Sequence, residues 1–171
     1  MLDGCYTEDN HLLEICLNLW IAKHYSMRKI SLIIVHCSAN KAGSAIRMAD
    51  IDRYHCSLGW NGCGYHYVIP VDGTIEPGRP EEMRGAHCKN HNRHSIGVCY
   101  VGGLAADGIT PEDTRTEAQK RALRELMELL HKRYPQALIV GHCDLDKMKP
   151  CCPGFDVVSE FCDLSLLLRR D

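Results

Sequence analysis

The amino-acid sequence predicts an α/β fold, a single three-layer domain with a central mixed β-sheet flanked by helices. Strand-like apolar runs alternate along the chain with segments whose apolar residues recur at helical spacing. The pair Asp72-Gly73 lies between two short extended segments and predicts a hairpin, which makes the sheet mixed. A chain of 171 residues is long enough for one domain with a substantial core.

The first residues predict a helix that precedes this pattern. Apolar side chains recur at helical spacing over residues 12–22, although Glu14 and Asn18 interrupt the run. The run is too short to span a bilayer, and it lacks the basic start and the cleavage site of a signal peptide. We therefore expect residues 1–27 to form a helical extension packed on a domain of residues 28–171.

The first half of the domain predicts a strand, a helix and a hairpin. Residues 29–36 are nearly all apolar and rich in isoleucine, which is typical of a buried strand. Residues 49–58 predict a helix that ends at Gly59. Residues 64–70 and 74–76 predict the two strands of the hairpin.

The second half continues the alternation. Residues 95–101 predict a strand, and residues 104–115, with their glycine and proline, predict a surface loop. Residues 137–140 predict a short strand, and residues 155–168 predict a closing helix with an apolar stripe.

Residues 116–133 show the clearest helical pattern. Thr116 can cap the helix, and Gln119 three residues later completes a capping box. The predicted apolar face consists of Ala122, Leu123, Leu126, Leu129 and Leu130.

The composition is that of a soluble globular protein, for which we expect a monomer. The net charge of −2 gives no sign of binding to nucleic acid or to an acidic membrane surface. Eleven cysteines cannot all pair within one chain, and their spacing shows no disulfide framework. Cysteines inside apolar runs, such as Cys37 and Cys99, are expected to be small buried hydrophobes.

Two histidines lie at the ends of predicted buried strands. His36 ends one strand and His142 directly follows another. Functional side chains in α/β sheets gather beyond strand ends, so the two rings can meet, although a lone histidine there is more often structural. With Cys152 from a nearby loop they offer nitrogen and thiolate ligands, which suit zinc. Three protein ligands leave a fourth position open, as in a catalytic site.

Five sequence runs in order resemble one enzyme family. The runs IIVHCSA, GYHYVIPVDGTIEPGRP, GAHCKNHN, SIGVCYVGG and GHCDLDKMKPCCPGFD are similar to the N-acetylmuramoyl-L-alanine amidase family typified by the phage T7 lysozyme. The resemblance covers about residues 30–156 and implies the fold that this family shares with peptidoglycan recognition proteins. It also implies zinc-dependent hydrolysis of the amide bond between N-acetylmuramic acid and L-alanine in peptidoglycan.

The family motifs fall on particular residues of this chain. The resemblance implies that His36, His142 and Cys152 are the zinc ligands. The tyrosine of the family's Gly-Tyr-His motif falls on Tyr65, which would contact the reacting water or the developing oxyanion. A lysine shortly before the ligand cysteine is expected to stabilise negative charge in the transition state.

The loop before Cys152 departs from the family pattern. The family has lysine, one residue and then Cys-Pro, whereas this chain carries one residue more. Lys149 is the preferred lysine and Lys147 the alternative, and Cys151 is an alternative to Cys152 as the ligand.

Other histidines carry weaker expectations. The resemblance places His87 in the substrate groove, and a structural role for it is equally compatible with the sequence. His55, His66, His91 and His131 lie at predicted helix-surface or strand positions and are expected to have no part in the chemistry.

Two rival functions remain open at this stage. One is a recognition module that binds peptidoglycan without cutting it, but non-catalytic members of the family typically lack the cysteine. The other is a structural metal protein or a redox protein. For the amidase, we expect synthesis in the cytoplasm and action on the cell wall, reached by phage-like release or by non-classical export.

Overall fold

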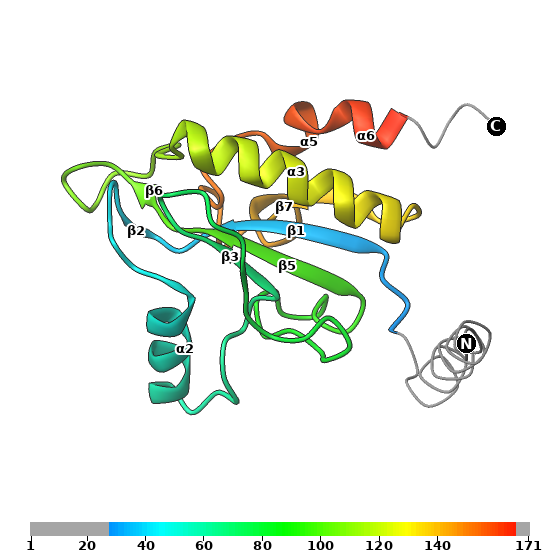
Figure 1. Cartoon of the computed structure of the whole chain (residues 1–171), viewed down its shortest axis with the longest axis horizontal. Helices are drawn as coiled ribbons and strands as arrows, with labels where there is room; N and C mark the ends of the chain where they lie inside the picture. The colour runs from blue at the N-terminus through cyan, green and yellow to red at the C-terminus, as the bar shows by residue number, and fades with distance from the viewer. Residues whose placement is uncertain (1–27, 167–171) are drawn as a thin grey trace, which may run out of the picture.

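The computed structural model describes residues 28–166 and contains one central five-stranded sheet (Figure 1). The strand order is β4-β3-β5-β1-β7, with bounds β1 Leu32–Cys37, β3 Tyr67–Ile69, β4 Glu76–Pro77, β5 Ser95–Tyr100 and β7 Leu138–Gly141. β1 pairs in parallel with β5 and β7, and β3 pairs in parallel with β5. β3 and β4 are antiparallel, so the predicted hairpin and the mixed sheet are confirmed.

The two central strands explain the apolar runs of the sequence. Every residue of β5 is buried, as are the four middle residues of β1. Strands covered on both faces cannot alternate apolar and polar side chains, because neither face meets water.

Helices cover both faces of the sheet. In Figure 1, α3 (Glu117–Arg133) lies across one face together with α5 (Val157–Glu160) and α6 (Cys162–Leu166), and α2 (Met48–Ser57) lies on the opposite side. The larger core forms between the sheet and α3, and a smaller cluster joins Ile51 of α2 to the sheet. The predicted three-layer arrangement is therefore confirmed.

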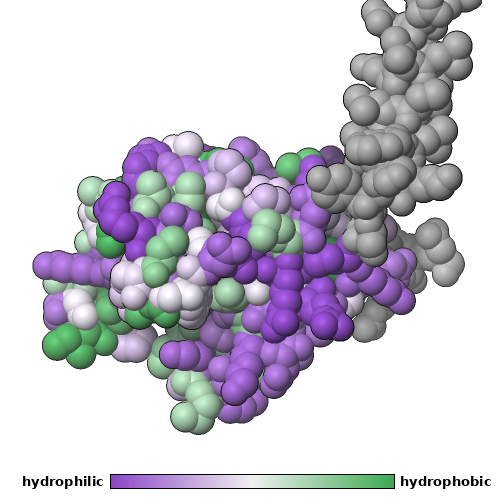
Figure 2. All heavy atoms as spheres, turned by 90° about the horizontal axis from the view of Figure 1, so that it is seen from below, coloured by the Kyte–Doolittle hydropathy of each residue, from purple (hydrophilic) through white to green (hydrophobic). Residues whose placement is uncertain are grey.

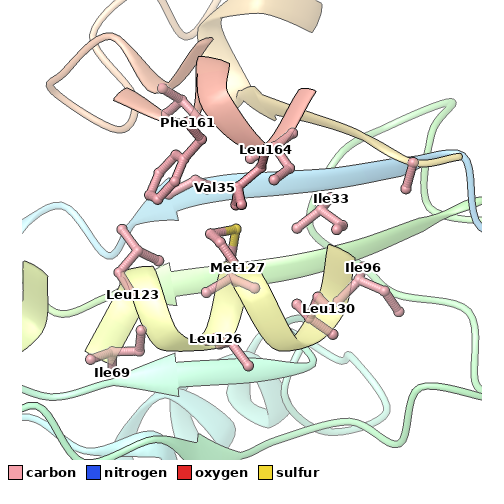
Figure 3. Packing of buried hydrophobic residues seen from close by; sticks show 14 of the residues in the cluster. Ile33, Val35, Ile69, Ile96, Leu123, Leu126, Met127, Leu130, Phe161 and Leu164 are labelled. Carbon is pink, nitrogen blue, oxygen red and sulfur yellow. The ribbon is translucent and has the colours of Figure 1, made fainter. Parts of the chain in front are cut away.

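The capping box of α3 forms as predicted. Thr116 Oγ1 accepts a hydrogen bond from the Gln119 N–H at 3.1 Å, and the Thr116 N–H donates to Gln119 Oε1 at 3.0 Å. Figure 3 shows Leu123, Met127 and Leu130 directed from α3 into the core. The predicted apolar face is wrong at Leu129, which is 50% exposed, because the buried stripe turns toward Met127 instead.

The closing helix differs from its prediction. Residues 155–168 were expected to form one helix, but the described part contains two short helices that meet at Phe161. Asp156 caps the first of them by accepting a hydrogen bond from the Ser159 N–H at 3.0 Å. Phe161 is 1% exposed, and the break lets its ring and Leu164 enter the core (Figure 3).

The predicted surface loop of residues 104–115 is anchored at both ends. It begins in β6 (Gly103–Leu104), which pairs in parallel with β2 (Asn40–Lys41). It ends at Arg115, which is buried and donates to both carboxylate oxygens of Glu160 at 2.7 and 2.8 Å. Most residues of the loop are exposed, as predicted, and Arg115 attaches the end of the loop to the closing helices.

The surface that carries α2 is largely hydrophilic. Figure 2 shows hydrophobic residues there only in small, separate groups. In residues 28–166, no helix is long and apolar enough to cross a membrane. The predicted extension of residues 1–27 lies outside the described residues, as do the last residues of the predicted closing helix.

Candidate active site

The parallel pairing of β1 and β7 brings His36 and His142 together. Val35 pairs with Gly141, and each is followed directly by one of the histidines. The two rings lie with their centroids 4.5 Å apart, and both residues are buried. The predicted meeting of strand-end histidines at one edge of the sheet is therefore confirmed.

Cys152 reaches the same place from the loop that follows α4 (His142–Leu145). Its carbonyl accepts a hydrogen bond from the Cys143 N–H at 2.8 Å, and the next carbonyl, of Pro153, accepts from the Tyr100 hydroxyl at 2.6 Å. The potential ligand atoms of His36, His142 and Cys152 all lie within 4.8 Å of one another.

Cys151 lies outside this cluster. Its side chain is exposed and lines a separate cavity of about 500 Å³ beside Pro111 and Asp156. Of the two adjacent cysteines, the structure therefore brings only Cys152 to the histidines.

The protonation of the cluster suits a metal cation. Burial, together with the imidazoles of His87 and His142, lowers the pKa of His36 well below its usual range. Burial also lowers the pKa of His142. Both rings are thus neutral at neutral pH, which is the form that binds a metal.

The thiol of Cys152 needs a cation to become a ligand. Its Sγ lies 3.9 Å from the Cys37 Sγ and 3.5 Å from the Cys37 backbone nitrogen. The hydrogen bond with Cys37 and burial raise the pKa of Cys152, whereas the same hydrogen bond lowers the pKa of Cys37 to about 7. A cation bound between His36, His142 and Cys152 would favour the Cys152 thiolate by direct attraction. Two imidazoles and one thiolate are a donor set that fits zinc.

Tyr65 packs against the cluster. Its ring centroid lies 5.2 Å from that of His36. Burial raises the pKa of Tyr65 well above its usual range. The phenol therefore keeps its proton at neutral pH and can donate a hydrogen bond.

The two candidate lysines occupy different positions relative to the cluster. Both are exposed in the loop between α4 and Cys152. The charge of Lys149 adds to burial in lowering the pKa of His142, against the opposite effect of Asp146. The charge of Lys147 acts on Cys143 instead. The charge of Lys149 thus acts on a residue of the cluster, whereas the charge of Lys147 acts on a cysteine outside it.

His87 lies between a surface cavity and the cluster. It lines a cavity of about 670 Å³ together with Trp60, Arg84 and Lys89. Its Nδ1 also lies 3.0 Å from His36 Nε2, so it touches the cluster.

Two histidines expected at helix-surface or strand positions are buried. The His55 ring stacks on Trp60 with centroids 4.5 Å apart, and its Nδ1 accepts a hydrogen bond from the Gly64 N–H. His66 Nδ1 accepts from the Gly97 N–H at 2.9 Å. Both support the walls of the site through backbone contacts. The spacing of Ile51 and His55, four residues apart on one helix face, could have revealed the burial of His55.

Comparisons with known proteins identify the family of the chain. The sequence profile of the N-acetylmuramoyl-L-alanine amidase family matches residues 26–155. The endolysin of Klebsiella phage KP32 is 42% identical over 130 residues, which cover 76% of this chain and 84% of the endolysin. The endolysin of Escherichia phage T7 is 39% identical over 125 residues, which cover 73% of this chain and 81% of the endolysin.

A solved structure shares the fold. The N-acetylmuramoyl-L-alanine amidase LysC from Clostridium intestinale superposes with a TM-score of 0.66 at 26% identity, covering 84% of this chain and 87% of LysC. The profile match spans most of the chain, and the phage relatives are well above 30% identical over most of their own length. The chain therefore belongs to the N-acetylmuramoyl-L-alanine amidase family of enzymes.

Proposed function

We propose that the protein is a zinc-dependent hydrolase of bacterial peptidoglycan that cleaves the amide bond between the lactyl group of N-acetylmuramic acid and L-alanine. The observation that carries this proposal is the cluster of His36, His142 and Cys152, with ligand atoms within 4.8 Å of one another. A three-residue donor set of this kind leaves one coordination position open for chemistry.

Zinc at this site would polarise the substrate carbonyl and acidify water at neutral pH. The protein's own groups act on the charge that develops as the amide is attacked. The protonated phenol of Tyr65 donates a hydrogen bond to the carbonyl oxygen as that oxygen becomes negative. The ammonium of Lys149 adds positive charge that acts on His142. Donors aimed at such charge commonly stabilise the transition state by about 3 kcal/mol each.

Two cavities are lined by side chains that contact His36, which supports an extended substrate. One cavity, of about 670 Å³, includes His87 and the cationic residues Arg84, Lys89 and Arg93. The other, of about 510 Å³, includes Tyr65 and polar groups of Ser38, Asn40 and Asp50. Peptidoglycan has sugar on one side of the scissile amide and peptide on the other. The cationic cavity suits the carboxylates of the peptide.

The phage relatives support the bacterial cell wall as the place of action, because both are endolysins. A module that binds the wall without cutting it is the alternative function. Binding alone needs no set of metal ligands, so the closeness of His36, His142 and Cys152 favours hydrolysis.

Release of soluble fragments from purified cell walls tests the proposal. We expect chelator-treated protein to release nothing and to regain activity when zinc is added back. His36→Ala should lose both zinc and wall release, whereas His131→Ala, a change on the distant helix α3, should retain both. Circular dichroism would establish that the variants are folded. Substantial release by zinc-free His36→Ala would contradict the metal mechanism, and binding to walls without release would indicate a recognition module.

A further inference from the structure

A chain of hydrogen bonds leads from His36 away from the ligand cluster. His36 Nε2 lies 3.0 Å from His87 Nδ1, and His87 Nε2 lies 3.3 Å from Ser95 Oγ. Ser95 Oγ in turn donates to the backbone carbonyl of His91 at 2.9 Å. The chain thus links a residue of the cluster to a carbonyl group through two intermediate side chains.

The backbone carbonyl of His91 determines the direction of every hydrogen bond in this series. A carbonyl only accepts, so the single hydroxyl proton of Ser95 points to His91. Ser95 Oγ must then accept from the Nε2–H of His87. A neutral imidazole carries one N–H, so His87 Nδ1 is an acceptor and takes the proton of His36 Nε2. By the same rule, the lone pair of the neutral His36 ring is on Nδ1.

The ring of His87 occupies a space that exists because two neighbouring residues, Gly85 and Gly97, have no side chain. A Cβ atom at Gly97 would lie 2.5 Å from the Cγ and Cδ2 atoms of this ring, and a Cβ atom at Gly85 would lie 2.5 Å from its Cδ2. The backbone N–H of His87 donates to Asn92 Oδ1 at 2.8 Å. Packing and hydrogen bonding therefore hold the ring in place on several sides.

We propose that His87 and Ser95 are positioning residues that hold His36 in the tautomer protonated on Nε2, so that Nδ1 is the nitrogen presented to the metal. This inference rests on the proposed zinc site. Hydrogen bonds to the far nitrogen of a metal-binding histidine fix the ring orientation and strengthen the ligand. The usual acceptor is a carboxylate or a carbonyl, and here a second imidazole takes that place.

The tautomer can be read directly from the wild-type protein. Long-range ¹H–¹⁵N correlation spectra of the ¹⁵N-labelled, zinc-loaded protein distinguish protonated, metal-bound and free imidazole nitrogens. We expect His36 to be protonated on Nε2 and metal-bound through Nδ1, and His87 to be protonated on Nε2. Coordination of zinc by His36 Nε2 would overturn the inference, because His87 could not then accept its proton.

A matched set of variants tests the contribution to metal binding, measured by competition with a zinc chelator of known affinity. His87→Leu removes the acceptor, and we expect zinc affinity to fall about 10- to 100-fold. His87→Asn places an amide oxygen near the former Nδ1 and should recover most of this loss. Ser95→Ala should weaken zinc binding in the same direction, and His131→Leu on α3 should leave it unchanged.

The outcomes separate this inference from the proposed function. If His36→Ala abolishes zinc binding while His87→Leu binds zinc as tightly as the wild type, the positioning role of His87 is overturned. The proposed zinc site would remain supported. If zinc affinity falls equally in His87→Leu and His87→Asn, the loss comes from altered packing. The positioning role of the His87 hydrogen bond is then also overturned. A wild-type protein that binds no zinc would overturn both.

Discussion

His36 lies in β1, His142 directly follows the neighbouring parallel strand β7, and their ring centroids are 4.5 Å apart. Their closeness follows from backbone pairing, because the residues directly before them, Val35 and Gly141, are partners in the sheet. The pairing of the two strands therefore determines the positions of both histidines. The position of the cysteine depends instead on the loop after α4.

Substitution of each of the two adjacent cysteines in turn tests which one is the metal ligand. Cys152→Ser should lose zinc, because its thiol is the group beside the two histidines. Cys151→Ser should retain zinc and activity, because that side chain is exposed outside the cluster. Metal content measured after gel filtration checks both variants. The opposite pattern would shift the loop assignment by one residue.

Removal of each lysine tests which one acts in catalysis. Lys149→Ala should keep its zinc and lose about 100-fold in kcat, because the charge of Lys149 acts on His142 of the cluster. Lys147→Ala should remain near wild-type activity, since its charge acts on Cys143 instead. Steady-state kinetics on solubilised peptidoglycan, with metal content measured in parallel, checks this. A larger loss in Lys147→Ala would show that the lysine assignment is wrong.

Tyr65→Phe separates the hydroxyl from the ring. The phenylalanine ring can still pack against His36, so zinc binding and KM should be nearly unchanged. The lost hydrogen bond to the oxyanion should lower kcat by about 100-fold. An activity within about twofold of the wild type would mean that Tyr65 only packs against the site.

The fold and the histidine pair were predictable because both depend on local patterns. Unbroken apolar runs mark buried strands, and parallel strands bring their ends together at one edge. The sequence favours Cys152 over Cys151 only through the family motif, since the choice depends on how the loop lies against Cys37. The contact between His36 and His87 was equally out of reach, because 51 residues separate them and loops set the distance.

The errors in the helices have a similar origin. Periodicity predicts the centre of an apolar stripe but not its edges, so Leu129 was wrongly assigned to the core in place of Met127. The closing segment was predicted as one helix because its apolar spacing does not reveal the break at Phe161. Tertiary packing decides both features.

Acid should destabilise the fold through His66. Burial is the main cause that lowers the pKa of His66 to about 4, from an ordinary value of 6.5. Between these two values the unfolded chain binds a proton that the folded protein does not, so stability falls as the pH drops from 6.5 to 4. Above pH 6.5 this group contributes no pH dependence, and across the window it removes about 3 kcal/mol.

Urea unfolding at pH 7 and pH 4 measures this effect. In His66→Asn, an amide oxygen can still accept from the Gly97 N–H, but no group at this position titrates. The variant should lose less stability than the wild type over the same pH range, by about 3 kcal/mol. Equal losses in the two proteins would show that His66 does not contribute.

Mass analysis of the products from purified peptidoglycan, digested with the zinc-loaded protein, tests the central claim most directly. We expect free stem peptides that begin with the α-amino group of L-alanine, together with glycan strands whose lactyl carboxylates are unsubstituted. Both products should be missing after digestion with the His36→Ala variant. New reducing sugar ends, or cuts within the stem peptide while the lactyl amide stays intact, would contradict the account.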